Sequence, residues 1–293
     1  MRVLAVGLMC GAMLCFTGLD TCAKWLGLTL PATQIVWARY VAAALIALAA
    51  SRPLARPSAL RSKKPWLQTV RSALLLGSTT ANFLALRQLQ LSETATISFL
   101  TPIFVALFAG PLLGERVGAE RMAAIAAGFL GVVIATRPGT AAFQPIVFVA
   151  IAGVLCNTGY VLATRRLASE DAPQTTLAWT QIAGIVLLTP LLPWVWRQPA
   201  TPQVWLIMAT MGVFGAGGHA LLIVAHRFAP APALTPFSYT QLVWMIVSGV
   251  LVFGDWPSVE TLVGAALVVI CGVYLALRER RGQRSSVSGI RQI

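Results

Sequence analysis

The sequence predicts an all-α integral membrane protein in which ten transmembrane helices form two inverted five-helix repeats. Three observations lead to this fold class. Only 11% of the 293 residues are charged and 57% are hydrophobic, whereas about 25% of the residues in an ordinary soluble domain are charged. The apolar residues fall into ten runs, each long enough to cross about 30 Å of hydrocarbon at about 1.5 Å per helical residue. Segments of the first half also recur in the second half at a nearly constant spacing.

The ten runs lie between charged or Pro- and Gly-rich breaks. In chain order they are Val3 to Leu28, Ala32 to Ala50, Trp66 to Leu86, Thr94 to Leu113, Ala119 to Thr136, Pro145 to Thr164, Thr175 to Trp196, Pro202 to Ala225, Ala233 to Phe253, and Val259 to Leu277. The first run could also be a signal peptide, but Asp20 and Lys24 occur there without a small-residue cleavage site. We therefore expect an uncleaved first helix.

The basic residues indicate which way the chain enters the membrane. An even number of spans places both termini on one side, and 17 of the 22 Lys and Arg residues, Arg71 among them, then belong to that side. The opposite side receives only Lys24, Arg87, Arg137 and Arg197. Because Lys and Arg are concentrated in cytoplasmic loops, both termini of this multi-pass membrane protein are predicted to be cytoplasmic.

An internal duplication relates the two halves. Leu14–Gly18 recurs as Leu155–Gly159, and Pro31, Thr33 and Trp37 recur as Pro173, Thr175 and Trp179. Gly77, Ala85, Arg87, Ser98, Gly114 and Glu120 recur as Gly217, Ala225, Arg227, Ser238, Gly254 and Glu260, 140 positions later. We assign residues 1–140 and 141–280 to two repeats and residues 281–293 to a basic cytoplasmic tail. Since each repeat has five spans, the second enters the membrane from the opposite side.

Inverted repeats favour a transporter, because they give many secondary transporters two exchangeable conformations around a site near the midplane. Two other classes compete with this hypothesis. An intramembrane enzyme would need a cluster of catalytic or metal-binding groups at usable spacing, and none is evident. A channel would normally present rings of like residues in an oligomer, whereas a duplicated chain favours a self-contained carrier that functions as a monomer.

Two segments resemble a known family. Ala85 to Glu115, with Ser92, Ala95, Ser98–Leu100, Pro102 and Leu113–Glu115, resembles the third and fourth helices of an EamA-type domain, and Phe253–Asp255 and Gly264–Val273 resemble the end of a second copy. The chain is thus similar to the drug/metabolite transporter superfamily with paired EamA-type domains, most of all to inner-membrane exporters of aromatic and other amino acids. The resemblance implies broad-specificity amino acid export by alternating access; the alternative is export of another small metabolite or drug, with or without proton coupling.

The second copy departs from the first at two places. Asp255 replaces Glu115, and Gln241-Leu242 stands where the first copy has Thr101-Pro102. Without this proline, a kink shared by the fourth and ninth spans is in doubt.

Polar and aromatic residues at equivalent depths form a candidate substrate site. They are Thr17, Thr79, Asn82, Phe99, Thr101, Asn157, His219, Tyr239, Gln241 and Trp244. Hydroxyls and amides can bind an ammonium or a carboxylate, and an aromatic wall tolerates varied side chains. Each residue could instead serve interhelical hydrogen bonding or packing.

Three charges in the outer part of the membrane form a candidate gate or ion pair. Asp20 lies in the first span, Lys24 is one turn further along the same helix face, and Arg39 is expected at similar depth in the second span. A structural ion pair, a gate or substrate contact, and a proton carrier all remain open. A carboxylate beside two cations favours facilitated export or exchange over proton coupling.

Helix breakers suggest where the protein bends. Pro102 removes a backbone hydrogen bond from the fourth span, and Gly215, Gly217 and Gly218 leave one region of the eighth span nearly free of side chains. We predict hinges at these residues; close helix approach is the alternative for the glycines.

The remaining features predict no cofactor and no metal. The five cysteines lie in apolar runs without zinc or disulfide spacing, and no phosphate-binding glycine loop with lysine is present. The net charge of +13 belongs to membrane orientation rather than to nucleic acid binding. The predicted partners are therefore a small-molecule substrate and the lipid bilayer.

Overall fold

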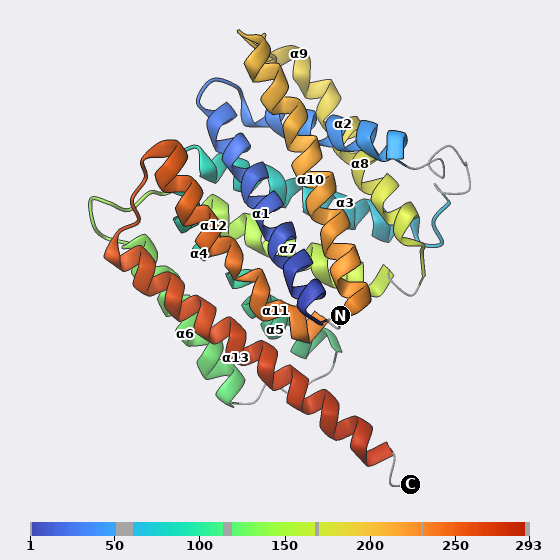
Figure 1. The fold of residues 1–293 in the computed structure, drawn as a ribbon, viewed down its shortest axis with the longest axis vertical. Helices are drawn as coiled ribbons and strands as arrows, with labels where there is room; N and C mark the ends of the chain where they lie inside the picture. Colours follow the sequence, from blue (N-terminus) through green and yellow to red (C-terminus); the bar gives the residue numbers. More distant parts are fainter. Residues whose placement is uncertain (1, 51–60, 114–118, 168–169, 230, 291–293) are drawn as a thin grey trace.

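The computed structural model describes residues 2–50, 61–113, 119–167, 170–229 and 231–290, and in these ranges the chain forms helices and no strand (Figure 1). The first half contains α1 (Arg2–Gly27), α2 (Ala32–Ala50), α3 (Pro65–Leu86), α4 (Leu91–Ser98), α5 (Leu100–Leu113) and α6 (Ala119–Thr136). The second half contains α7 (Val147–Leu167), α8 (Pro173–Leu188), α9 (Leu192–Val195), α10 (Pro202–Phe228), α11 (Ala231–Ser238), α12 (Thr240–Ser248) and α13 (Val259–Ile290). A 3₁₀ turn, Thr189–Leu191, joins α8 to α9, and a π-helical turn, Gly249–Phe253, follows α12.

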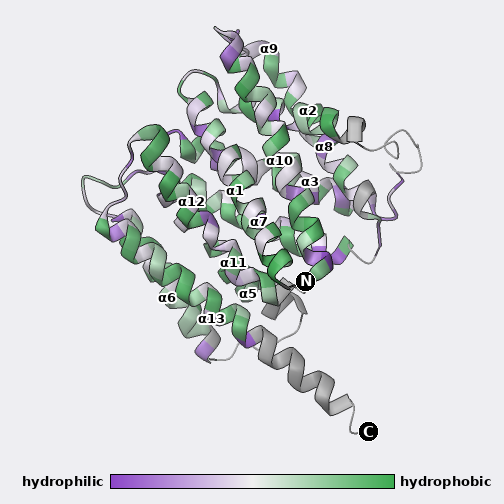
Figure 2. Cartoon of the chain, in the orientation of Figure 1, coloured by the Kyte–Doolittle hydropathy of each residue, from purple (hydrophilic) through white to green (hydrophobic). Residues whose placement is uncertain are grey.

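The length and apolar composition of the helices are those of a multi-pass membrane protein. Seven helical segments of the described residues are long and apolar enough to cross a bilayer, and two further apolar helices, Ala32–Ile46 and Met122–Thr136, are shorter. The segment α3 is 22 residues long but contains Gln68, Arg71 and Asn82, which lower its hydropathy. A count of ten spans therefore stays a prediction. Large apolar side chains are exposed along the outer helices, and α6 and residues 259–277 of α13 are mostly hydrophobic (Figure 2).

The two halves pack against each other through equivalent helix pairs. The helix α1 lies along α10, and α7 lies along α3; under the repeat, these pairs are the same pair with the halves exchanged. Gly11 faces Leu221 and Gly18 faces the ring of Phe214, so residue numbers increase along α1 where they decrease along α10. The two helices are therefore antiparallel, and small residues on α1 allow their close approach.

The last helices of the two halves, α6 and α13, are also antiparallel. The segments α6 and α13 lie side by side at one edge of the molecule (Figure 1). Glu120, near the start of α6, forms an ion pair with Arg278 of α13 at 3.1 Å, and Arg137, after the end of α6, pairs with Glu260 at the start of α13 at 3.6 Å. Equivalent helices that run antiparallel are the relation that an inverted repeat requires.

The end of α13 differs from the sequence prediction. The apolar run ends near Leu277, yet the helix continues to Ile290 into the residues assigned to the basic tail. A helix does not have to end where hydrocarbon ends, because polar residues with good helix propensity, such as Arg and Glu, can extend it. Residues 291–293 of the predicted tail lie outside the described residues.

Candidate substrate site

The centre of the molecule contains two broken helices in equivalent positions. In the first half the helix is interrupted at Phe99, between α4 and α5, and in the second half at Tyr239, between α11 and α12. The backbone angles match, with φ −70° and ψ −4° at Phe99 and φ −70° and ψ −10° at Tyr239. Both ψ values are far from the α-helical value of about −42°.

Both helices are broken at equivalent positions even though the second repeat has no proline equivalent to Pro102. Pro102 follows the first break by three residues, whereas Pro236 precedes the second break by three residues and lies inside α11. Each proline lacks an N–H and so removes one backbone hydrogen bond from its helix. Each repeat thus has a proline about one turn from its break, after the break in the first repeat and before it in the second. The ninth span is therefore interrupted although it has Leu242 where the fourth span has Pro102.

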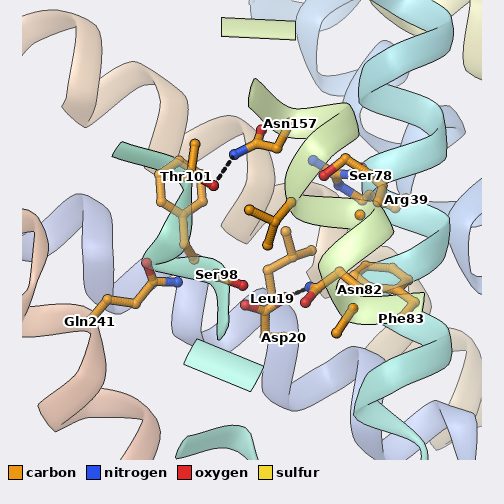
Figure 3. Close-up of a pocket in the computed structure, with 15 residues that line it drawn as sticks. Leu19, Asp20, Arg39, Ser78, Asn82, Phe83, Ser98, Thr101, Asn157 and Gln241 are labelled. Carbon is orange, nitrogen blue, oxygen red and sulfur yellow. Dashed lines mark hydrogen bonds between the residues drawn. The ribbon is translucent and has the colours of Figure 1, made fainter. Parts of the chain in front are cut away.

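A cavity of about 300 Å³ lies between the two halves (Figure 3). Its walls come from α1, α2, α3, α4 and α5 of the first half and from α7 and α12 of the second. The lining residues are Phe16, Leu19, Asp20, Arg39, Ser78, Thr79, Asn82, Phe83, Ser98, Thr101, Ala150, Gly153, Val154, Asn157 and Gln241. The volume is at the lower end of the range, about 300 to 1,000 Å³, that is typical of small-molecule sites.

Two opposite charges line this cavity, and both are held by α3. The side chain of Asp20 is buried, and its Oδ1 accepts a hydrogen bond of 3.0 Å from Nδ2 of Asn82. Nη1 of Arg39 donates a hydrogen bond of 2.7 Å to Oγ1 of Thr79. Thr79 and Asn82 are three residues apart and therefore lie on one face of α3. Although Asp20 and Arg39 line the same cavity, no ion pair joins them in the described part of the chain.

Other residues that line the cavity carry hydroxyl and amide groups. Nδ2 of Asn157 on α7 donates to Oγ1 of Thr101 on α5 at 3.2 Å, which links the second half to the first. Ser98 and Gln241 face the cavity from α4 and α12 (Figure 3). The cavity thus offers groups that can donate and accept hydrogen bonds, between apolar surfaces that include Phe16 and Phe83.

Five of the ten predicted substrate residues line the cavity: Thr79, Asn82, Thr101, Asn157 and Gln241. The other five lie elsewhere. Thr17 is buried and donates to the carbonyl oxygen of Met13 in its own helix at 3.0 Å. His219 packs its ring against Phe16, with centroids 5.1 Å apart.

The last three of these residues are aromatic. Phe99 and Tyr239 pack against each other at the helix breaks. The indole N–H of Trp244 is buried with no hydrogen-bond partner in the described ranges.

Lys24 has a different partner from the one that the sequence predicts. Its Nζ forms an ion pair of 2.5 Å with Oδ2 of Asp255 and donates to the carbonyl oxygen of Leu89 at 3.1 Å. The ring of Phe253 lies 4.9 Å from the same ammonium. One helical turn separates Lys24 from Asp20, and this turn carries the lysine beyond the cavity to the connection before α13. Lys24 therefore binds to the second half through Asp255, and Asp20 is hydrogen-bonded to Asn82 instead of pairing with Lys24.

Arg71, assigned from the sequence to the cytoplasmic side, is a buried residue of α3. Its guanidinium donates to Thr164 at 2.7 Å, to Thr180 at 2.7 Å and to the hydroxyl of Tyr160 at 3.0 Å, and it stacks 4.5 Å from the Tyr160 ring. These contacts join α3 to α7 and α8. The signal in the sequence is a lone arginine inside an otherwise apolar run, which marks a residue facing protein rather than lipid.

The predicted glycine hinge lies in an unbroken helix. The segment α10 runs from Pro202 to Phe228 through Gly215, Gly217 and Gly218. A Cβ at Gly218 would lie 2.8 Å from the ring of Phe16, whereas one at Gly215 would meet nothing within 4 Å. Gly218 therefore allows α1 and α10 to approach each other closely, and bending at these glycines stays a prediction.

The chain matches one protein family along nearly its whole length. The model of the EamA-like transporter family matches residues 3–137 and again residues 144–278. The two matches coincide with the halves that the structure relates by antiparallel packing.

Individual relatives span most of the chain at low identity. An S-adenosylmethionine uptake transporter of Rickettsia prowazekii is 21% identical over 269 residues, covering 91% of this chain and 90% of the relative. A riboflavin transporter of Rhizobium johnstonii is 28% identical over 285 residues, covering 93% and 91%. A solved crystal structure with 20% identity superposes with a TM-score of 0.66 over 94% of this chain and 98% of the other.

Proposed function

Because the chain belongs to the EamA-like transporter family, we propose that it is a carrier that moves a small polar metabolite through the central cavity by alternating access. Its family and its relatives are named as transporters rather than as enzymes. The finer assignment, export of amino acids, has less support than transport of another metabolite, because the relatives are named for S-adenosylmethionine and riboflavin.

The observation that carries the proposal is a polar cavity between two inverted halves of one chain. Both halves contribute walls, and Asn157 and Thr101 hydrogen-bond across them. Polar groups inside a membrane protein are costly unless they face water or a partner, so a cavity lined with them is a candidate pathway. Since one chain supplies both halves, we propose that a monomer in the inner membrane is sufficient for transport.

The lining favours a substrate with a flat ring and several hydrogen-bonding edges. Amides of Asn82, Asn157 and Gln241 can pair with a heteroaromatic edge in either polarity, because each amide both donates and accepts. Phe16 and Phe83 offer apolar area to the ring face. The adenine of S-adenosylmethionine and the flavin of riboflavin both have this character, and aromatic amino acids share the ring.

The alternating movement has a structural basis in the two breaks. One helix of the first half is interrupted at Phe99 and the equivalent helix of the second half at Tyr239, so each half has a point at which it can bend. At one end, Lys24 and Asp255 tie α1 to the connection before α13, and opening of that end requires their separation. Under the predicted orientation, this is the side away from the cytoplasm.

Counterflow in proteoliposomes tests the proposal. Vesicles preloaded with unlabelled S-adenosylmethionine, riboflavin or an aromatic amino acid are diluted into the labelled compound, and uptake is followed with and without a pH gradient. Thr101→Val removes a hydroxyl from the cavity wall, and Thr210→Val removes one that only bonds the carbonyl oxygen of Leu206 in its own helix. We expect the first variant to lower the rate and the second to leave it unchanged. Equal rates in both variants, or no counterflow of any polar metabolite by folded protein, would contradict the proposal.

A further inference from the structure

We propose that Asp20 and Arg39 form a dipolar subsite that binds the head group of an α-amino acid or of a metabolite that contains one. Asp20 accepts hydrogen bonds from the ammonium group, and Arg39 donates to the carboxylate. The inference rests on the proposed function, since it names the substrate class of the same cavity.

The charges of Asp20 and Arg39 share a cavity and do not neutralise each other in an ion pair. In a site of low polarity, opposite charges attract each other more strongly than they do in water. Yet each charge is bonded to a neutral side chain of α3, with Asn82 holding Asp20 and Thr79 holding Arg39. A purely structural ion pair would bring the two groups into contact. Here α3 keeps them apart.

Both groups keep free hydrogen-bonding capacity. Within the described residues, the hydrogen bonds to Asn82 and Thr79 use Oδ1 of Asp20 and Nη1 of Arg39. A carboxylate has a second oxygen, and a guanidinium has further N–H groups in a fixed fork that fits a carboxylate. Both side chains line the cavity (Figure 3), so these remaining atoms are available to a ligand.

The formal charges that line the cavity balance each other. Among the residues that line the cavity, Asp20 and Arg39 are the two that carry charge, and their formal charges sum to zero. A zwitterion satisfies both groups at once, whereas a net anion or a net cation satisfies one and leaves the other charge desolvated without a partner, which is unfavourable. A head group with both signs is therefore the ligand that this wall matches.

The geometry also places the rest of such a ligand. Asp20 and Arg39 are both bonded to α3, whereas Thr101 and Gln241 line the cavity from α5 and α12, away from the Arg39 side chain (Figure 3). A head group bound between Asp20 and Arg39 directs its side chain toward these groups. Variation in that side chain is compatible with one fixed head-group site.

The test measures which half of the head group each residue recognises. Purified protein in detergent is titrated with L-phenylalanine, N-acetyl-L-phenylalanine, which lacks the ammonium, and L-phenylalaninamide, which lacks the carboxylate; dissociation constants come from thermal stabilisation. The wild type is expected to bind phenylalanine about tenfold to a hundredfold more tightly than either blocked compound, since each analogue loses a charge-assisted contact.

Two variants that each remove one charge should lose different parts of this selectivity. Asp20→Asn keeps an acceptor for Asn82 and should lose the preference over the N-acetyl compound while retaining the preference over the amide. Arg39→Gln should show the reverse; glutamine already occupies the equivalent position of the second repeat, Gln181. Thr210→Val serves as the control and should bind all three compounds as the wild type does. If a variant does not fold, Asp20→Glu and Arg39→Lys replace it, and each should weaken the same preference.

The outcomes separate this inference from the proposed function. Riboflavin has no amino acid head group. If it is carried in counterflow while phenylalanine binds no better than its blocked analogues, the dipolar subsite is wrong and the proposal that the protein is a carrier is still supported. If no compound is carried but the head-group preferences appear and divide between the two variants, the subsite stands and the transport proposal fails. Loss of both preferences together in each variant also overturns the division of roles.

Discussion

Phe99 and Tyr239, which occupy equivalent positions in the two halves, meet edge to face with their ring centroids 4.8 Å apart and their planes at 66°. A residue can touch its own equivalent only near the axis that relates the repeats. Both residues also mark the point at which a membrane helix is broken. The axis therefore passes close to the two breaks, beside the cavity to which the neighbouring residues Ser98 and Thr101 contribute.

The first prediction concerns the coupling between these two rings. Phe99→Ala and Tyr239→Ala each remove one ring, and the double variant removes both. Because edge-to-face pairs contribute about 0.5 to 1.5 kcal/mol beyond area burial, the double-mutant cycle should give a coupling of that size in the free energy of unfolding. Denaturation in detergent measures it. Additive effects, within about 0.5 kcal/mol, would mean that the contact contributes nothing specific.

The second prediction concerns the ion pair between Lys24 and Asp255. Its side chains are 12% and 27% exposed, so an unpaired charge left behind is only partly solvated. Lys24→Glu and Asp255→Lys should each destabilise the protein by about 1.5 to 3 kcal/mol, and the exchanged double variant should recover most of this loss. The unfolding free energy and the counterflow rate are both measured.

A matched control for this experiment is the pair Arg137 and Glu260. It is longer, at 3.6 Å, and its side chains are 31% and 49% exposed. Charge reversal there should cost less than about 1 kcal/mol. If the two pairs respond alike, the Lys24 contact does not have the structural role described here.

The sequence predicts that the chain contains a repeat, but it does not predict which distant residues contact each other, because local patterns carry only the first kind of information. Duplicated residues such as Glu120 and Glu260 indicate two equivalent units, in agreement with the two matches to the family model, and a count of five spans per unit predicts the inversion. The polar residues Thr79, Asn82 and Asn157 indicate a cavity because polar groups in apolar runs need a reason to be there. These inferences use composition and local spacing alone.

Contacts between distant segments depend on helix register, which local patterns do not contain. Asp255 lies 231 positions from Lys24, and nothing near either residue in the sequence points to the other. Thr17 shows the same limit: it is predicted at the depth of the site, and its hydroxyl donates a hydrogen bond to its own helix. Depth along a helix is readable from sequence, whereas the direction of a side chain depends on packing.

The third prediction concerns acid stability at the connection between α7 and α8. Burial alone would raise the pKa of Asp171, but hydrogen bonds donated by Ser62, by the backbone N–H of Lys63 and by Gln68 together hold its pKa below the usual value. For a carboxylate with a depressed pKa, the stabilisation is present above the unfolded-state pKa of about 3.9 and is lost as the pH falls through the folded-state value.

The Asp171→Asn variant tests this linkage. At pH 7 it should unfold at a lower temperature than the wild type, and the difference should shrink as the pH falls below about 4. Thermal unfolding of both proteins across this pH range provides the measurement. A difference that grows toward acid pH would show that the sign of the linkage is wrong.

The fourth prediction is the orientation of the chain. The distribution of Lys and Arg places both termini in the cytoplasm, so the connection at residues 138–146, after five spans, lies on the other side. Alkaline phosphatase inserted after Ala141 should be active, and a fluorescent protein fused to the C-terminus should fold and fluoresce. The reverse pattern would contradict the orientation. An active phosphatase after Ala141 together with a C-terminal fluorescent protein that stays dark would contradict an odd number of spans in the second half.

The fifth prediction concerns the contact between α6 and α13. A Cβ at Gly264 would collide with the backbone oxygen of Gly131 and would lie 2.8 Å from the Cβ of Ala135; a Cβ at Gly131 would lie 2.7 Å from the oxygen of Gly264. Because the obstacle is backbone, it cannot rotate away. Membrane helices associate mainly through close van der Waals packing, so Gly264→Ala should separate them and lower the free energy of unfolding by about 1 to 3 kcal/mol. Gly7→Ala is the matched control, since its Cβ would meet nothing within 4 Å, and it should be neutral or stabilise α1 by up to about 1 kcal/mol. If both substitutions have the same effect, small residues are not what holds α6 and α13 together, and the ion pairs at the two ends of these helices become the contacts to test next.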